Sequence, residues 1–80
     1  MVRVRVDVML KDEILDPQGQ AIERALPALG IEGVDRVRVG KHIELDVEDG
    51  PDLDERIVDM ASKLLSNPVI ERFTYEVARG

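Results

Sequence analysis

The sequence predicts an α+β fold, a two-layer sandwich in which two helices lie on one face of an antiparallel sheet. Three observations lead to this expectation: strict alternation of apolar and polar residues over 34–47, similar alternation near both ends of the chain, and two helix-type apolar stripes between these segments. Alternation with a period of two is typical of a strand that buries one face and exposes the other. The predicted order is strand, helix, long bent strand or hairpin, helix, strand.

The stretch 34–47 is expected to form the centre of the sheet, because it lies between the two helices in the sequence. Its apolar side chains occupy odd-numbered positions, namely Val37, Val39, Ile43, Leu45 and Val47. Two interpretations are open at Gly40: the chain turns into a hairpin, or one long strand continues with a bend or bulge. We favour the long bent strand, because the alternation keeps its phase across Gly40 and no Asn-Gly or Asp-Gly turn is present.

The first strand is followed by a helix with a recognisable start. The strand is apolar at its even positions, Val2, Val4, Val6 and Val8. Asp16 is a suitable N-cap and Pro17 suits the first helical position. The helix then has one apolar stripe, formed by Ile22, Ala25, Leu26 and Leu29. Pro27 predicts a kink or an early end, and Gly30 is expected to end the helix with positive φ.

The second helix is expected to begin at Asp52, which forms a capping-box pattern with Glu55. Its predicted buried stripe consists of Leu53, Ile57, Met60, Ala61 and Leu64. Asn67, in the left-handed conformation, and Pro68 are expected to end it. The last strand should carry Glu71, Phe73, Tyr75 and Val77 on one face and Arg72, Thr74 and Glu76 on the other.

Together these elements predict a ferredoxin-like plan within a single domain that spans residues 1–80. The sheet face opposite the helices should be mixed and charged, in contact with water or with a partner. It is expected to carry Arg3, Arg5, Arg36, Arg38, Glu44, Arg72, Thr74 and Glu76.

Composition excludes several functional classes. With no cysteine, the chain has neither disulfides nor thiolate metal ligands. A formal net charge of −6 and two aromatic residues, Phe73 and Tyr75, argue against nucleic-acid binding. The apolar runs are too short to span a membrane, and the N-terminal residues do not have the pattern of a signal peptide. We therefore expect a cytoplasmic protein that binds neither nucleic acid nor membrane.

The search for chemistry identifies no catalytic, cofactor-binding or metal-ligating residue. His42 is the only histidine and is expected on the outer face of its strand. Asp52, Asp54 and Glu55 resemble a metal cluster, but their position at a helix N-terminus favours capping. Ser62 and Ser66 have no base nearby in the sequence. The residues alone therefore indicate a small interaction domain.

Several segments, in this order and spacing, resemble the PurS family, the small subunits of phosphoribosylformylglycinamidine (FGAM) synthase. They are Leu15-Asp16-Pro17-Gln18-Gly19, Val37-Arg38-Val39-Gly40-Lys41 with Glu44-Leu45, Lys63-Leu64-Leu65-Ser66-Asn67-Pro68-Val69-Ile70-Glu71, and Tyr75-Glu76-Val77. The resemblance covers essentially the whole chain. Pro27 departs from the family pattern and leaves the geometry of the first helix open.

The resemblance implies a part in de novo purine synthesis, where formylglycinamide ribonucleotide (FGAR), glutamine and ATP give FGAM. It implies a non-catalytic subunit that bridges a synthetase subunit and a glutaminase subunit and supports ammonia transfer. ATP and Mg²⁺ would be used by the synthetase partner, so no cofactor is expected in this chain. A homodimer, possibly a tetramer, is implied as well, and we expect the stretch 34–47 and the last strand to extend the sheet between copies.

Two rival functions share the same fold plan. An ACT-like regulatory domain that binds a small molecule is the main alternative, although the connector 10–16 lacks the glycine-rich loop that such a domain needs. A nucleic-acid-binding module would need aromatic residues on the sheet face and a basic balance.

Overall fold

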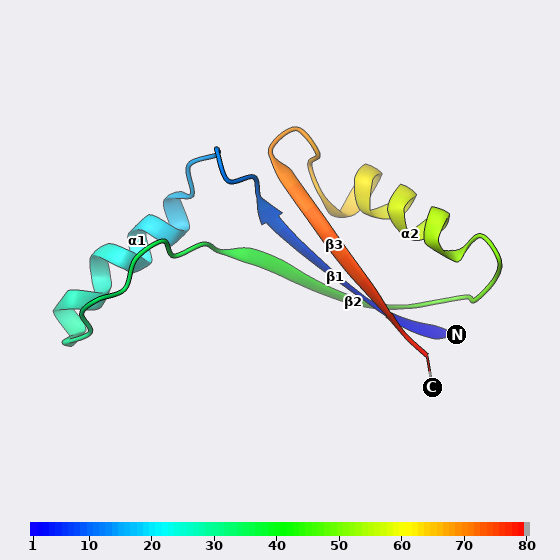
Figure 1. The fold of residues 1–80 in the computed structure, drawn as a ribbon, viewed down its shortest axis with the longest axis horizontal. Helices are drawn as coiled ribbons and strands as arrows, with labels where there is room; N and C mark the ends of the chain where they lie inside the picture. Colours follow the sequence, from blue (N-terminus) through cyan, green and yellow to red (C-terminus); the bar gives the residue numbers. More distant parts are fainter. Residues whose placement is uncertain (80) are drawn as a thin grey trace.

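The computed structural model describes residues 1–79 (Figure 1). Its elements, in chain order, are β1 (Val2–Leu10), α1 (Pro17–Ala25), a 3₁₀ turn (Leu26–Leu29), β2 (Gly40–Val47), α2 (Leu53–Met60), a π-helical turn (Ala61–Leu65) and β3 (Glu71–Ala78). The three strands form one antiparallel sheet in the order β2-β1-β3. The α+β class with an antiparallel sheet and two helices is therefore confirmed.

The central strand is β1, and the expectation that the stretch 34–47 lies at the centre was wrong. Val6 of β1 is paired with Ile43 of β2 on one side and with Tyr75 of β3 on the other. Val4 and Val6 are completely buried, whereas Ile43 is only half-buried. The alternation over 34–47 reported a strand with one apolar face, and such a pattern does not distinguish an edge strand from a central one.

The core lies between one face of the sheet and α2. The even-numbered valines of β1 and Val47 pack against Leu53, Ile57 and Ala61 of α2 and its continuation. Leu64 was expected in this stripe, but it is 81% exposed, and Leu65 packs against the core instead. The reason is the π-helical turn, where the Ser66 N–H donates to the Ala61 carbonyl five residues back. The extra residue in this turn shifts the helical phase by one position.

The start and end of α1 agree with the sequence. Asp16 caps the helix and Pro17 occupies its first turn. The α-helix ends at Ala25, before Pro27, and a 3₁₀ turn follows, so the early end predicted from Pro27 is confirmed. Gly30 ends the turn with φ of 77°, a left-handed conformation that glycine adopts without steric penalty.

The prediction that both helices cover one face of the sheet was wrong for α1. Figure 1 shows that α1 lies beyond the end of the sheet, at the opposite end of the molecule from α2, and no residue of α1 belongs to the core. Its predicted stripe is consequently open: Ile22 is 42% exposed and Leu29 73% exposed. The molecule measures 50 × 30 × 14 Å with a radius of gyration of 16.2 Å. A compact chain of this length would have a radius of gyration of about 12 Å.

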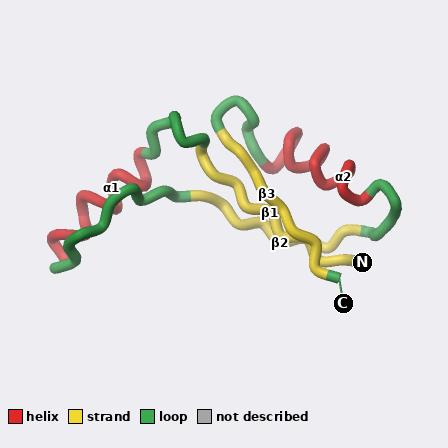
Figure 2. Tube along the Cα trace, viewed as in Figure 1, coloured by secondary structure: helices red, strands yellow, loops and turns green. Residues whose placement is uncertain are grey.

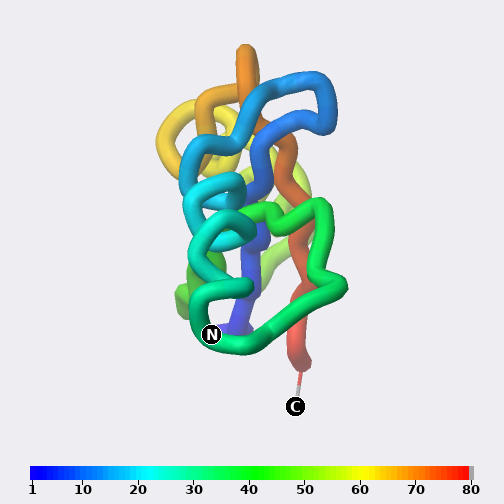
Figure 3. The backbone as a smooth tube through the Cα atoms, turned by 90° about the vertical axis from the view of Figure 1, so that its left-hand side faces the viewer, coloured from blue at the N-terminus to red at the C-terminus, as the bar shows by residue number. Residues whose placement is uncertain are grey.

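The segment before Gly40 is not part of the sheet, so the predicted long strand forms only over Gly40–Val47, and the chain makes no hairpin turn at Gly40. β2 begins at Gly40, and residues 34–39, which we call the return segment, run beside α1 (Figure 2). Figure 3, viewed from the α1 end, shows the same green stretch beside the cyan helix. A side chain at Gly40 would place its Cβ 2.5 Å from the Val8 carbonyl oxygen, so only glycine fits where the chain enters the sheet.

Two predicted helix signals at the ends of α2 were wrong. Asp52 is the N-cap residue, but its side chain makes no capping hydrogen bond and instead accepts from Arg56 Nε at 3.2 Å. With ψ of 17°, Asp52 lacks the extended conformation that a capping box requires. Asn67 does not adopt positive φ; its Oδ1 accepts from the Val69 N–H at 3.1 Å, which stabilises the turn.

Candidate functional site

The feature that stands out is a projecting arm, residues 15–39, formed by α1 and the return segment. Asp16 joins its two parts at the base. One carboxylate oxygen accepts from the Gly19 N–H at 3.0 Å, and the other accepts from the Val39 N–H at 2.7 Å. These two hydrogen bonds, that of Gly19 foremost, lower the pKa of Asp16 below its usual value. Asp16 is only 4% exposed, and burial by itself acts to raise the pKa of its carboxyl group, but the two backbone hydrogen bonds outweigh this effect.

Further contacts hold the return segment against the helix. Glu23 of α1 accepts from the Val37 N–H at 2.6 Å. Gly19 lies so close to the Val37 carbonyl that a Cβ there would stand 2.0 Å from the oxygen. Together with Asp16, these contacts make the arm a fixed structure.

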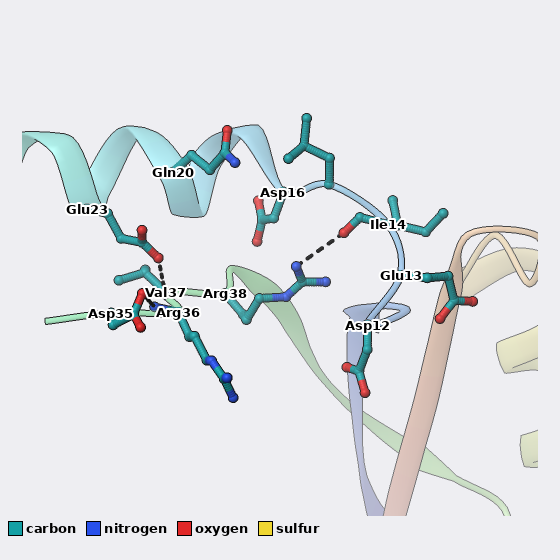
Figure 4. Close-up of a pocket in the computed structure, with 11 residues that line it drawn as sticks. Asp12, Glu13, Ile14, Asp16, Gln20, Glu23, Asp35, Arg36, Val37 and Arg38 are labelled. Carbon is teal, nitrogen blue, oxygen red and sulfur yellow. Dashed lines mark hydrogen bonds between the residues drawn. The ribbon is translucent and has the colours of Figure 1, made fainter.

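A groove runs between the arm and the connector that follows β1, and Arg38 crosses it. Figure 4 shows the Arg38 guanidinium directed at the Ile14 carbonyl. Its donors reach the carbonyl oxygens of Ile14 at 3.1 Å and Lys11 at 2.9 Å. Arg36 points away from this contact in Figure 4 and has φ of 56°, unusual for a residue with a side chain. Arg38 therefore braces the arm against the sheet connector.

The outer face of the sheet, which we call the charged face, consists of side chains paired with one another. Arg3 contacts Asp46 at 2.9 Å and Glu44 at 3.1 Å. Arg5 contacts Glu76 at 3.1 Å. Arg3 and Arg5 are thus paired with carboxylates across the strands, as expected for a mixed face, whereas Arg36 and Arg38, which were expected on the same face, lie in the arm.

His42 lies on this charged face, as predicted. Its Nδ1 is 2.6 Å from Asp7 Oδ1, and its Nε2 is 3.1 Å from Glu44 Oε2. The hydrogen bond to Asp7, followed by that to Glu44, raises the pKa of His42. The same contact with His42 is the main cause that lowers the pKa of Glu44. Through the contact with Asp7, His42 ties β1 to β2 on the solvent side.

The other candidate groups have structural roles. Ser62 Oγ donates to the Val58 carbonyl at 2.7 Å, and Ser66 Oγ donates to the Ala61 carbonyl at 2.8 Å. Among residues 1–79, no group of three or more acidic or histidine side chains could hold a metal ion. Within the same residues, no helix is long and apolar enough to cross a membrane.

Apolar side chains on the arm are the feature that sequence reasoning missed. Exposed apolar residues occur along the whole arm, in α1 and in the chain that returns from it. Their exposed fractions are 67% for Leu15, 42% for Ile22, 73% for Leu29, 45% for Ile31 and 46% for Val34. The sequence signal for it is the apolar stripe of α1, which the sequence alone predicts to pack against the chain's own sheet. The arrangement is suited to recognition of another protein surface.

Comparisons with known proteins identify related sequences and structures over almost the whole chain. The family model described as PurS, phosphoribosylformylglycinamidine (FGAM) synthase, matches residues 3–79. The PurS subunit of FGAM synthase from Mycobacterium leprae is 51% identical over 74 residues, 92% of each chain. The crystal structure of Bacillus subtilis PurS superimposes with a TM-score of 0.92 at 45% identity, covering 99% of this chain and 100% of that one. PurS-like similarity extends to a structure of PurLQS from Thermotoga maritima, with a TM-score of 0.77 at 26% identity over 96% of both chains.

Proposed function

This chain belongs to the PurS family of FGAM synthase subunits, and from that premise we propose that it is the non-catalytic subunit that bridges the synthetase and glutaminase subunits. The single observation that carries the proposal is the match to PurS over residues 3–79, which includes the arm, the sheet and α2. The likeness to a chain in the PurLQS structure supports a place in a complex of that kind.

The chemistry of the chain supports a bridging role. Arg3, Arg5 and His42 of the charged face are paired with carboxylates. In the arm, Asp16 and Glu23 hold the two parts together. The exposed apolar residues lie on a fixed projection, which is a geometry for contact with protein surfaces.

In this proposal the complex converts FGAR, glutamine and ATP to FGAM in the cytoplasm. The synthetase partner uses ATP and Mg²⁺, and the glutaminase partner releases ammonia. This chain, as a homo-oligomer, holds the two partners in the orientation that ammonia transfer needs.

Reconstitution tests the proposal. Synthetase and glutaminase subunits from the same source are mixed with FGAR, glutamine and ATP, and glutamine-dependent FGAM formation is followed with and without this chain. Size exclusion with light scattering reports assembly of the same mixtures. We expect both product and a three-component complex only when the chain is present.

The control is an Ile57→Asp variant, which places an unpaired charge at a position that is 1% exposed and so prevents folding of the core. It should support neither assembly nor product. Equal assembly and turnover without the chain would contradict the proposed bridging role.

A further inference from the structure

The outer edge of β3, which we call the open edge, has no strand beside it among residues 1–79, because β3 pairs only with β1. That pairing is regular from Glu71 to Ala78, without a bulge. Proteins commonly protect an edge strand with proline, lysine, a bulge or a covering segment. The sequence of β3 contains neither proline nor lysine. The open edge is therefore suited to pairing with a further strand.

The alternation of hydrogen bonds identifies the backbone groups that the open edge offers. The Lys11 N–H donates to the Ile70 carbonyl at 2.8 Å, and these two residues face each other in the continued β1–β3 register. Opposed residues of an antiparallel pair alternate between hydrogen-bonded and non-bonded positions. The even-numbered residues of β3 therefore bond to β1. The odd-numbered residues Phe73, Tyr75 and Val77 direct their N–H and C=O groups to the open edge.

Helix α2 provides an apolar and acidic surface beside this edge. Tyr75 Oη donates to Asp54 Oδ1 at 2.9 Å, so this side of α2 lies next to β3 (Figure 1). Val58 lies one turn further along the same side and is 42% exposed. Glu55 and Asp59 are exposed neighbours, and with Asp54 they form what we call the acidic flank. A strand added at the open edge would lie beside Val58 and the acidic flank.

The acidic flank favours a basic occupant over a second copy, although the sequence led us to expect a second copy at the last strand. Antiparallel pairing of two β3 strands has a two-fold axis perpendicular to the sheet, which would place both α2 helices on one face with their acidic flanks facing each other. Within the described part of the chain, only Asp59 of the flank is paired with a cation, Lys63 at 2.8 Å. Juxtaposed like charges oppose association, whereas lysine or arginine of a partner is attracted.

We propose that the open edge of β3 binds an extended segment of a partner subunit, in which apolar and polar residues alternate and lysine or arginine lies nearby. This inference rests on the proposed bridging function and specifies one of its contacts. Main-chain hydrogen bonds to Phe73, Tyr75 and Val77 hold the segment. Its apolar side chains continue the row that these three residues form on the core face, and cover Val58. Its basic side chains meet the acidic flank.

Amide hydrogen exchange with single-residue resolution tests the added strand in the complex of this chain with the synthetase and glutaminase subunits. In the free chain the amides of Thr74 and Glu76 bond to β1 and should exchange slowly, whereas those of Phe73, Tyr75 and Val77 should exchange fast. We expect assembly to slow exchange at the three odd-numbered residues by about tenfold or more. Contact through side chains alone would not select alternate amides.

The outcomes separate this inference from the bridging function. A complex that forms with unchanged exchange at Phe73, Tyr75 and Val77 would overturn the added strand and leave the bridging function intact. Failure of the three subunits to assemble would overturn both. Slow exchange at the same residues that develops with rising concentration of this chain alone would assign the open edge to a second copy and overturn the partner segment.

A matched pair of variants at Val77 isolates the main-chain hydrogen bond. Val77→Pro removes the N–H that points to the open edge, whereas Val77→Ala keeps it and shortens the side chain. Proline is tolerated in an edge strand where the N–H faces away from the sheet, and unchanged exchange at Val6 verifies the fold. We expect Val77→Pro to bind the partner subunits at least about tenfold more weakly than Val77→Ala in a titration followed by light scattering. Equal affinities would overturn the added strand.

A second pair, Val58→Lys and Val58→Glu, tests the charge of the occupant. Both variants lose the same apolar contact at an exposed position, so their difference reports charge alone. A basic segment should bind the Val58→Lys chain about tenfold more weakly than the Val58→Glu chain at low salt, and the difference should shrink as salt is added. The reverse order would overturn the basic occupant.

Discussion

Replacement of Gly19 by alanine tests whether α1 and the return segment form one rigid arm. In an isolated helix this change is stabilising, by about 0.5–1 kcal/mol, because glycine has more conformational freedom to lose. Here the new methyl group would stand 2.0 Å from the Val37 carbonyl oxygen and 2.9 Å from its carbon. Both atoms belong to the backbone, which cannot rotate out of the way as a flexible side chain does.

The steric clash decides whether Gly19→Ala stabilises or destabilises the protein. Ordinary van der Waals contact begins near 3.4 Å, so the return segment must move by more than 1 Å. A shift of that size breaks the 2.6 Å hydrogen bond from the Val37 N–H to Glu23. Overpacking of a tight contact costs about 1–3 kcal/mol. The net effect is a destabilisation of about 1 kcal/mol or more, confined first to the arm.

Amide hydrogen exchange measures this effect where it occurs. We expect the Val37 and Val39 amides to exchange about fivefold faster or more in Gly19→Ala, while Val6 in the central strand keeps its protection. Gln20→Ala, at an exposed position of the same helix, is the control and should leave all three amides unchanged. A rise in stability with unaltered exchange at Val37 would refute the rigid arm.

Three further predictions concern the sheet and α2. Ile57→Ala should lower the free energy of unfolding by about 2–5 kcal/mol in urea denaturation at fixed chain concentration, whereas Val58→Ala, at a position 42% exposed, should change it by less than about 0.5. Leu65→Ala should be more destabilising than Leu64→Ala in the same assay, because the π-helical turn directs Leu65 into the core; the reverse order would contradict that turn. The pKa of His42 is raised, so its stabilising contribution is complete below pH 6.5 and is lost as the pH rises through the folded-state pKa. An NMR titration of His42 should therefore have its midpoint above 6.5, and His42→Gln should remove this part of the pH dependence of stability.

The sequence predicted a structural feature correctly where that feature depends only on residues within one short segment. The even-numbered valines of β1 are buried as their spacing predicted. Asp16 caps α1 because a carboxylate in an extended residue reaches the free N–H groups of the first turn. Pro27 ends the α-helix because it has no N–H to continue the ladder. Each of these outcomes depends on chemistry within a few residues.

Predictions failed where the outcome depends on distant partners or on one residue's backbone angle. Leu64 fell on the apolar stripe of an ideal helix, but a single π turn moved the stripe to Leu65. The capping box at Asp52 failed because its ψ is not extended. The expectation that the chain carries no catalytic residue came from the sequence alone. The role of the arm could not be predicted, because the same apolar stripe can pack against the chain's own core or against another protein.

The internal contacts of the arm bear on assembly, because they fix the segment that carries the exposed apolar residues. A loose segment would have to be ordered when the arm meets a partner surface, and each residue fixed at that moment costs about 1–2 kcal/mol of conformational entropy. Asp16 and Glu23 hold the return segment in place before association, by hydrogen bonds to the Val39 and Val37 amides. That entropy is therefore lost during folding of the single chain, and association is favoured accordingly. For this reason Gly19→Ala should weaken assembly with partner subunits as well as the arm, because Gly19 lies directly against the Val37 backbone.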